Sequence, residues 1–150
     1  MARLRDEKAR LNLASYPQIF DVRAAYADVD SFQHLNNVAM ARYFEEGRAA
    51  MNMHLFGVDT VVRPSGGVQL LFATITIDYV AQGAYPGVVT VATGISKVGR
   101  SSFNQAGGLF QDERCIALCE AVTVYAVDGA GKPLPDDTIT AMRELAFAGS

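Results

Sequence analysis

One polar segment ahead of a long apolar stretch carries the side chains that could do chemistry. Asp28, Asp30, His34, Asn36 and Asn37 crowd a turn that leads into a predicted helix. The start of a helix offers unpaired N–H groups and a partial positive charge, which can hold the oxygen of a polarised carbonyl. A carboxylate beside it can attack the carbonyl carbon or activate water, and a histidine can orient or carry a proton. These residue types therefore allow acyl transfer.

The same residues have a structural interpretation. Asp and Asn favour turns for local reasons, and either Asn36 or Asn37 is suited to cap the helix. His34 is one of two histidines in the chain, and a single histidine often serves as a satisfied structural group. Spacing alone leaves both interpretations open.

The stretch 38–56 predicts a long amphipathic helix. Its apolar positions recur every three or four residues and form one stripe. They are Met40, Phe44, Gly47, Met51 and Leu55. Gly57 suits the left-handed position that ends a helix. A rod about 28 Å long follows from the rise of 1.5 Å per residue, and other elements have to pack closely around it.

Five further runs predict β-strands, one before the helix and four after it, separated by turn residues. They are 18–28, 68–80, 87–98, 101–111 and 114–128. Long strands have to curl round a single helix to bury both surfaces, so we expect an α+β fold. Residues 1–150 are expected to form one domain, with an N-terminal arm over 1–17 and a C-terminal tail over 136–150 that contains a short helix.

Three local features carry smaller predictions. The connection 59–67 is predicted to be flexible, and Gly107-Gly108 is predicted to mark a bulge or a close approach. Cys115 and Cys119 lie four apart in one strand, which predicts two side chains on the same face about 13 Å apart. They cannot pair there, so we expect reduced, buried thiols.

Composition limits the class of function. The chain has 150 residues, a net charge of −3 and 50% hydrophobic residues, which is typical of a globular protein. It has no basic block for nucleic acid, no apolar run long enough to span a membrane and no secretory signal, so a cytoplasmic protein is expected. The absence of a phosphate loop, a metal-ligand cluster and a serine-nucleophile motif argues against nucleotide, zinc and serine-hydrolase chemistry and fits a reaction without metal or cofactor.

The segment 26–48 resembles the signature of the 4-hydroxybenzoyl-CoA thioesterase-like branch of the hot-dog superfamily. That signature reads D-x-D-x-x-G-H-V-N-N followed by F-E-x-x-R, with Gln33 standing here in place of its glycine. The matching residues are Asp28, Asp30, His34, Leu35, Asn36, Asn37, Phe44, Glu45 and Arg48. The run 33–37 is also similar to Q-H-V-N-N of plant acyl-ACP thioesterases, and 77–103 resembles the family's second to fourth strands.

This resemblance implies a hot-dog fold, with a five-stranded antiparallel sheet wrapped around a long central helix. It implies a thioesterase that hydrolyses an acyl group off coenzyme A or an acyl-carrier protein, with coenzyme A as part of the substrate rather than a cofactor. Asp30 matches the catalytic carboxylate, acting as nucleophile or general base. Asn37 stands where the backbone N–H polarises the thioester carbonyl, and His34 matches the motif's proton carrier or orienting group.

The resemblance also implies assembly, because hot-dog sites usually lie between two subunits. A homodimer or homotetramer is expected, in which the turn of Arg100, Ser101 and Ser102 approaches the partner's helix start and meets substrate. Glu45 has two interpretations: an ion pair with Arg48 on the helix, or a position near the active site of a neighbouring subunit. Two other functions remain as alternatives, a hot-dog dehydratase or hydratase and a non-catalytic acyl-CoA-binding protein.

Overall fold

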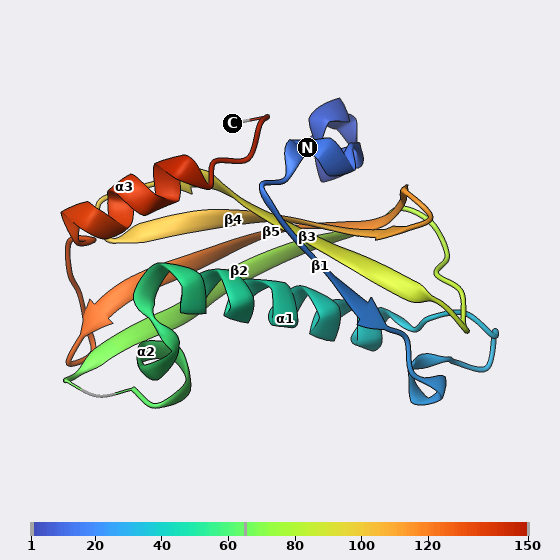
Figure 1. Ribbon diagram of the computed structural model, residues 1–150, viewed down its shortest axis with the longest axis horizontal. Coiled ribbons are helices and arrows are strands. Elements are labelled where there is room, and N and C mark those ends of the chain that lie inside the picture. The colour runs from blue at the N-terminus through green and yellow to red at the C-terminus, as the bar shows by residue number, and fades with distance from the viewer. Residues whose placement is uncertain (1, 65, 150) are drawn as a thin grey trace.

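A long helix lies across the inner face of a curled antiparallel sheet (Figure 1). The computed structural model describes residues 2–64 and 66–149, so Met1, Ser65 and Ser150 lie outside the described residues. The helices are η1 (Leu4–Asp6), η2 (Lys8–Leu11), η3 (Leu13–Ser15), η4 (Tyr26–Asp28), α1 (Asn37–Phe56), α2 (Val58–Val62) and α3 (Asp136–Glu144). The strands are β1 (Gln18–Arg23), β2 (Val68–Tyr79), β3 (Val88–Val98), β4 (Ser102–Gln111), β5 (Arg114–Val127) and β6 (Ala130–Gly131).

The main strands follow the order β1-β3-β4-β5-β2, and every pair is antiparallel. The predicted α+β hot-dog architecture is therefore confirmed. One feature was not predicted: the two-residue strand β6 pairs with the end of β5 and makes the sheet six-stranded. Within the described chain, β1 and β2 form the two edges of the sheet.

Helix α1 begins one residue earlier than predicted, at Asn37, and ends at Phe56 as predicted. The Asn36 side chain caps it by accepting the N–H of Ala39 at 2.7 Å, and Gly57 ends it with φ of +88°. Its buried face contains the predicted stripe, together with two further residues. The buried residues are Ala39, Met40, Tyr43, Phe44, Gly47, Met51 and Leu55.

Two glycines let α1 lie close to the sheet. A Cβ on Gly47 would lie 2.9 Å from Cγ2 of Thr93 and 2.9 Å from Cγ1 of Val91. A Cβ on Gly107 of β4 would lie 3.1 Å from the ring of Phe44. The predicted close approach at Gly107 is therefore confirmed, because helix and sheet meet there without room for a side chain.

A bulge changes the predicted placement of the cysteines. The β4–β5 register shifts between Leu109 and Phe110, which lie opposite Ala117 and Cys115. Because the shift reverses the alternation of side chains, Cys115 joins a cluster with Tyr16 on the outer face, whereas Cys119 packs beneath α1. The expectation that both cysteines share one face is wrong, and the expectation of free, buried thiols is confirmed.

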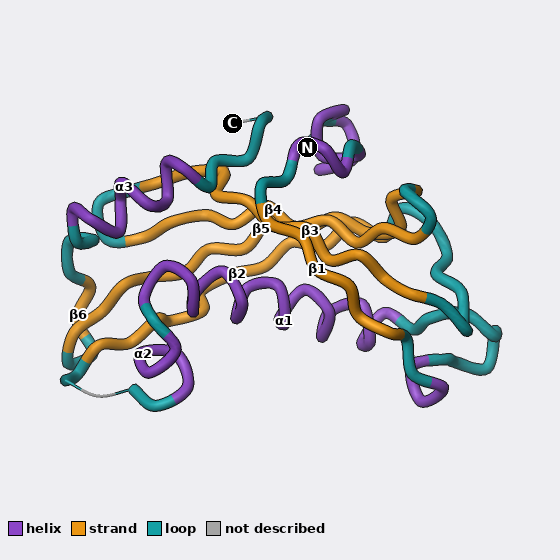
Figure 2. Tube along the Cα trace, viewed as in Figure 1, coloured by secondary structure: helices purple, strands orange, loops and turns teal. Residues whose placement is uncertain are grey.

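The N-terminal arm and the C-terminal tail cover the outer face of the sheet (Figure 2). Arg10 of the arm is 6% exposed, and its Nη1 contacts Oε2 of Glu120 on β5 at 2.8 Å. The predicted short helix in the tail is confirmed as α3. The segment 59–67 was predicted to be flexible; residues 59–62 belong instead to helix α2, and Ser65 lies outside the described residues.

Candidate active site

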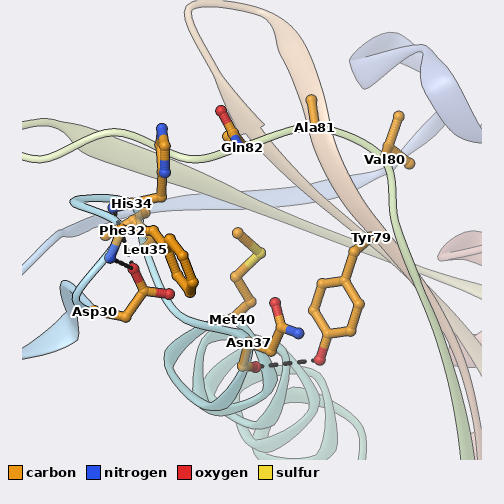
Figure 3. A pocket seen from close by; sticks show the side chains of 10 residues that line it. All are labelled: Asp30, Phe32, His34, Leu35, Asn37, Met40, Tyr79, Val80, Ala81 and Gln82. Atoms are coloured by element: carbon orange, nitrogen blue, oxygen red, sulfur yellow. Dashed lines mark hydrogen bonds between the residues drawn. The ribbon is translucent and has the colours of Figure 1, made fainter.

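A cavity of about 380 Å³ opens at the start of α1 (Figure 3). The turn before the helix, the first turn of the helix and the end of β2 supply its walls. The lining residues are Asp30, Phe32, His34, Leu35, Asn37, Met40, Tyr79, Val80, Ala81 and Gln82. The three residues assigned catalytic roles from the signature, Asp30, His34 and Asn37, thus lie around one cavity.

A tight turn holds the Asp30 carboxylate in place. Its Oδ1 accepts the N–H of Phe32 at 2.9 Å and, more weakly, the N–H of His34 at 3.5 Å. The Asp30 N–H donates to the carbonyl of His34 at 3.0 Å, and the Gln33 N–H donates to the carbonyl of Asp30 at 3.0 Å. Oδ2 of Asp30 accepts no hydrogen bond from the described residues, so one carboxylate oxygen is fixed and the other is available to react.

The backbone conformation at Gln33 explains why the family signature has a glycine at this position. The φ of Gln33 is +63°, in the left-handed region where glycine costs least. The turn keeps this conformation because its ends are tied to neighbouring segments. Asn36 donates its N–H to the carbonyl of Asp28 at 2.8 Å, and Leu35 donates its N–H to the carbonyl of Gly83 at 3.0 Å. The substitution therefore retains the turn.

Asp28 anchors the turn rather than lining the cavity. Its buried carboxylate accepts hydrogen bonds from the Tyr43 hydroxyl at 2.5 Å, from the N–H of Ala25 at 3.0 Å and from the Arg42 guanidinium. Burial raises the pKa of the Asp28 carboxyl, but these hydrogen bonds and the charge of Arg42 outweigh it and lower that pKa below 3.8. Asp28 therefore stays ionised and fixes the entry of the chain into α1.

The first N–H groups of α1 remain available at the cavity. The Ala39 N–H is taken by the Asn36 cap, whereas the N–H groups of Asn37 and Val38 have no acceptor in the described part of the chain. Positive charge of the helix dipole gathers at the same end. A carbonyl oxygen that lies opposite the Asn37 N–H would therefore meet uncommitted donors close to the Asp30 carboxylate.

Tyr79 is a site residue that sequence reasoning missed. It ends β2, and its hydroxyl donates to the carbonyl of Asn37 at 3.2 Å, which joins the edge strand to the first turn of α1. Burial raises the pKa of its phenol. Its segment was matched only as a strand of the family, and no spacing signal connects it with Asn37, forty-two positions earlier.

His34 reaches the cavity but not the reactive carboxylate. In Figure 3 its ring points away from the carboxylate of Asp30, and the contact between the two residues runs through the His34 N–H. No hydrogen bond joins the ring to Asp30 in the described chain. The geometry favours a role for His34 at a different part of the cavity wall from Asp30.

The predicted substrate-binding turn lies at the other end of α1. Arg100 and Ser101 lie in the connection between β3 and β4, Ser102 begins β4, and the carbonyl of Ser101 accepts the N–H of Tyr125 at 2.8 Å. Tyr125 stacks on Phe56, the last residue of α1, with ring centroids 5.8 Å apart. A helix of 20 residues separates this turn from Asp30, so one chain does not bring the two together.

The predicted ion pair between Glu45 and Arg48 does not form. Glu45 is exposed, and the Arg48 guanidinium lies 4.3 Å from the ring centroid of Phe72 on β2. No salt bridge within 4.0 Å joins Glu45 to Arg48. The Phe72 ring gives Arg48 a packing contact as well as a cation–π interaction, and this contact takes the place of the ion pair.

Two further properties concern the described residues as a whole. None of the helices in 2–64 or 66–149 is both long and apolar enough to cross a bilayer. In the same ranges, no three His, Cys, Asp or Glu side chains group together as a metal site would require.

Comparison with known proteins identifies the family of the chain. Residues 25–142 match the family model described as the thioesterase-like superfamily. No protein with a curated description matches the chain.

Solved structures share the fold over nearly their whole length. A predicted thioesterase from Bacillus stearothermophilus is 27% identical, with a TM-score of 0.77, over 85% of this chain and 95% of that one. A thioesterase from Thermus thermophilus, solved with coenzyme A and zinc, is 21% identical, with a TM-score of 0.74, over 85% and 98%. A gentisyl-coenzyme A thioesterase is 17% identical, with a TM-score of 0.73, over 83% and 99%.

Proposed function

Because this chain belongs to the thioesterase-like superfamily, we propose that it hydrolyses the thioester of an acyl group on coenzyme A or an acyl-carrier protein. The products are a carboxylic acid and a free thiol. One observation carries the proposal: Asp30 is held by its turn at the cavity where the first N–H groups of α1 are uncommitted. A carboxylate beside a carbonyl-binding helix start is the arrangement that acyl transfer needs.

In the proposed reaction the thioester carbonyl oxygen faces the N–H of Asn37. The donors and the helix dipole stabilise negative charge on that oxygen as the carbonyl carbon becomes tetrahedral. Asp30 either takes a proton from the attacking water or attacks the carbon itself, giving an anhydride that water then opens. In both routes the carbon–sulfur bond breaks, the thiolate leaves and takes up a proton, and the net consumption is one water. His34 is the proposed source of that proton.

Coenzyme A is the favoured carrier, because a thioesterase structure with the same fold was solved with coenzyme A bound.

A second copy of the chain is also part of the proposal. The outer edge of β2 is unpaired within the described chain and runs beside the cavity. Pairing of two such edges would form a homodimer, or a tetramer of two dimers, and bring Arg100, Ser101 and Ser102 of one copy toward the other copy's substrate.

The proposal needs no resident metal or cofactor, because Asp30, the helix start and water account for each bond that changes. The proposed location of the protein is the cytoplasm. If a metal took part, hydrolysis measured after treatment with a chelator would fall, whereas the proposed mechanism expects the same rate with and without the chelator.

A thiol-release assay tests the proposal. The protein is incubated with short-chain, long-chain and aromatic acyl-CoA thioesters, and free thiol is followed in the wild type and in Asp30→Asn. The amide can still accept the N–H of Phe32, so the turn is preserved, but it can act neither as base nor as nucleophile. We expect kcat to fall about 100-fold or more.

The matched control is Asp59→Asn on exposed α2, which removes the same charge away from the cavity and is expected to leave the rate unchanged. Equal hydrolysis by wild type and Asp30→Asn would refute the role of Asp30. Tight binding of the thioesters without any thiol release would instead identify a non-catalytic acyl-CoA-binding protein.

A further inference from the structure

Tyr79 of β2 reaches the start of α1 from the side of the cavity opposite Asp30 (Figure 3). Its hydroxyl donates to the carbonyl of Asn37 at 3.2 Å. The residue is 37% exposed, so its ring forms part of the cavity wall rather than of the core. Neither the family signature nor the proposed reaction assigns a role to this hydroxyl.

The backbone that carries Tyr79 is held firmly although β2 is an edge strand. Ala81, two residues later, donates its N–H to the carbonyl of Ile116 on β5 at 3.1 Å. From the N-terminal arm, Nη2 of Arg5 donates to the carbonyl of Tyr79 at 2.7 Å. The ring therefore extends toward α1 from a fixed point.

The Asn37 carbonyl belongs to the same peptide group as the N–H of Val38. Regular helix geometry engages one lone pair of this carbonyl with the N–H four residues on, and the second lone pair accepts the phenol. The Val38 N–H has no acceptor in the described chain. A donor to the oxygen of a peptide group polarises that group and makes its N–H a stronger donor. The bond from Tyr79 therefore strengthens an uncommitted donor at the helix start.

Two N–H groups at the start of α1 can then meet the oxygen of a thioester. The first N–H groups of a helix point outward along its axis, and that of Ala39 is already occupied by the Asn36 cap. Those of Asn37 and Val38 remain. Two donors stabilise an oxyanion more than one does, and only the second belongs to the peptide group that Tyr79 contacts.

The acidity of Tyr79 argues against a role in proton transfer. Burial raises the pKa of its phenol, so the hydroxyl keeps its proton at neutral pH and remains a donor. A phenol is also a weaker acid than a thiol, so transfer of its proton to the leaving thiolate is unfavourable. A role through the peptide group is the one that fits both the contact and the acidity.

We propose that Tyr79 is a positioning residue for thioester hydrolysis: its hydroxyl holds and polarises the peptide group between Asn37 and Val38, so that the Val38 N–H becomes a second donor to the carbonyl oxygen. This inference rests on the proposed function and extends its carbonyl-binding site. No bond to Tyr79 forms or breaks. The effect belongs in kcat, because the oxygen gains negative charge only as the carbon becomes tetrahedral.

A kinetic test compares Tyr79→Phe with the wild type in the thiol-release assay. Loss of one hydrogen bond is expected to lower kcat about 3- to 10-fold and to change KM less than about twofold. Tyr16→Phe is the matched control. The Tyr16 hydroxyl also donates to a backbone carbonyl, that of Arg10 at 2.8 Å, but in the cluster on the outer face of the sheet. This variant loses the same kind of bond and is expected to keep the wild-type kcat.

Infrared spectroscopy tests the same point without turnover. Butanoyl-, dodecanoyl- and benzoyl-CoA, each isotopically labelled at the carbonyl carbon, are bound to Asp30→Asn and to the double variant that also has Tyr79→Phe. Hydrogen bonds from the helix start weaken the carbonyl bond and lower the frequency of its band. Removal of the Tyr79 hydroxyl is therefore expected to raise that frequency, whereas Tyr16→Phe in the same background is expected to leave it unchanged.

The two proposals fail separately. Absence of thiol release by the wild-type protein would refute hydrolysis, while the carbonyl band would still decide the role of Tyr79. Thiol release together with an unchanged band in the Tyr79→Phe double variant would overturn the inference and leave hydrolysis standing. A higher KM at constant kcat, or an equal fall of kcat in Tyr16→Phe, would overturn it as well. Failure of all three thioesters to bind would refute both proposals.

Discussion

The Tyr43 hydroxyl donates a 2.5 Å hydrogen bond to Oδ2 of Asp28 and so ties the second turn of α1 to the segment that carries Asp30. Both groups are buried. Since the acceptor is ionised, the bond is stronger than one between neutral groups. The position of the candidate catalytic carboxylate relative to the helix start thus depends on a contact outside the cavity.

Tyr43→Phe is expected to lower the free energy of unfolding by about 1–3 kcal/mol, because Asp28 loses a hydrogen bond that water does not readily replace. Urea unfolding followed by circular dichroism measures the change. Tyr85→Phe is the control, because Tyr85 is 40% exposed and its hydroxyl forms no hydrogen bond with the described chain. Equal stability of the two variants would contradict the proposed anchoring role.

The lowered pKa of the Asp28 carboxyl also predicts how the free energy of unfolding depends on pH. The folded-state pKa lies below the ordinary 3.8, so the unfolded chain binds protons first as the pH falls. The stabilisation is complete at neutral pH and is lost progressively as the pH drops through 3.8 toward the folded-state pKa. Unfolding free energies from about pH 7 to about pH 3 should fall less steeply in Asp28→Asn than in the wild type. Parallel curves would show that Asp28 does not contribute.

Gly47→Ala is expected to destabilise the protein by about 1–3 kcal/mol, although alanine favours helix over glycine. The added methyl group would meet two sheet side chains at 2.9 Å. Thermal or urea unfolding measures the effect. Gly131→Ala is the matched control, because its added Cβ finds ordinary contacts at 3.8 Å and beyond. A Gly47→Ala protein as stable as the wild type would mean that α1 can move away from the sheet.

The two cysteines are expected to resist thiol reagents in the folded protein. Burial raises the pKa of Cys115 to about 11 and that of Cys119 to about 12, so the reactive thiolate is scarce at about pH 8. Labelling with a chromogenic disulfide should be slow in buffer and reach both thiols in denaturant. Rapid labelling of the native protein would show that the β4–β5 region opens readily.

The periodic elements were predictable because their signals are local. The stripe from Met40 to Leu55 and the cap at Asn36 need only residues within α1 and its first turn. The strands were likewise predictable, because each is a run of β-branched residues between turn residues. The order of the strands in the sheet was not predicted, since no local pattern states which strand pairs with β5.

What could not be predicted depends on contacts between distant segments. The bulge opposite Leu109 separates the two cysteines by face, and it is visible only as a register shift between two strands. Arg48 could have paired with Glu45 on the helix, but Phe72 on β2 provides the contact instead. The signature likewise located Asp30, His34 and Asn37 in the turn and helix start without indicating Tyr79, whose hydroxyl reaches the same helix start from β2.

The arm on the outer face has a consequence for synthesis of the chain. Arg10 is synthesised 110 positions before its partner Glu120, and the carbonyl of Ser15 accepts the N–H of Ala148 at 2.9 Å only after every strand of the sheet has been made. The sheet face that the arm covers therefore stays bare while the strands are being made. The arm and the segment after α3 can therefore pack onto that face only once the sheet has formed.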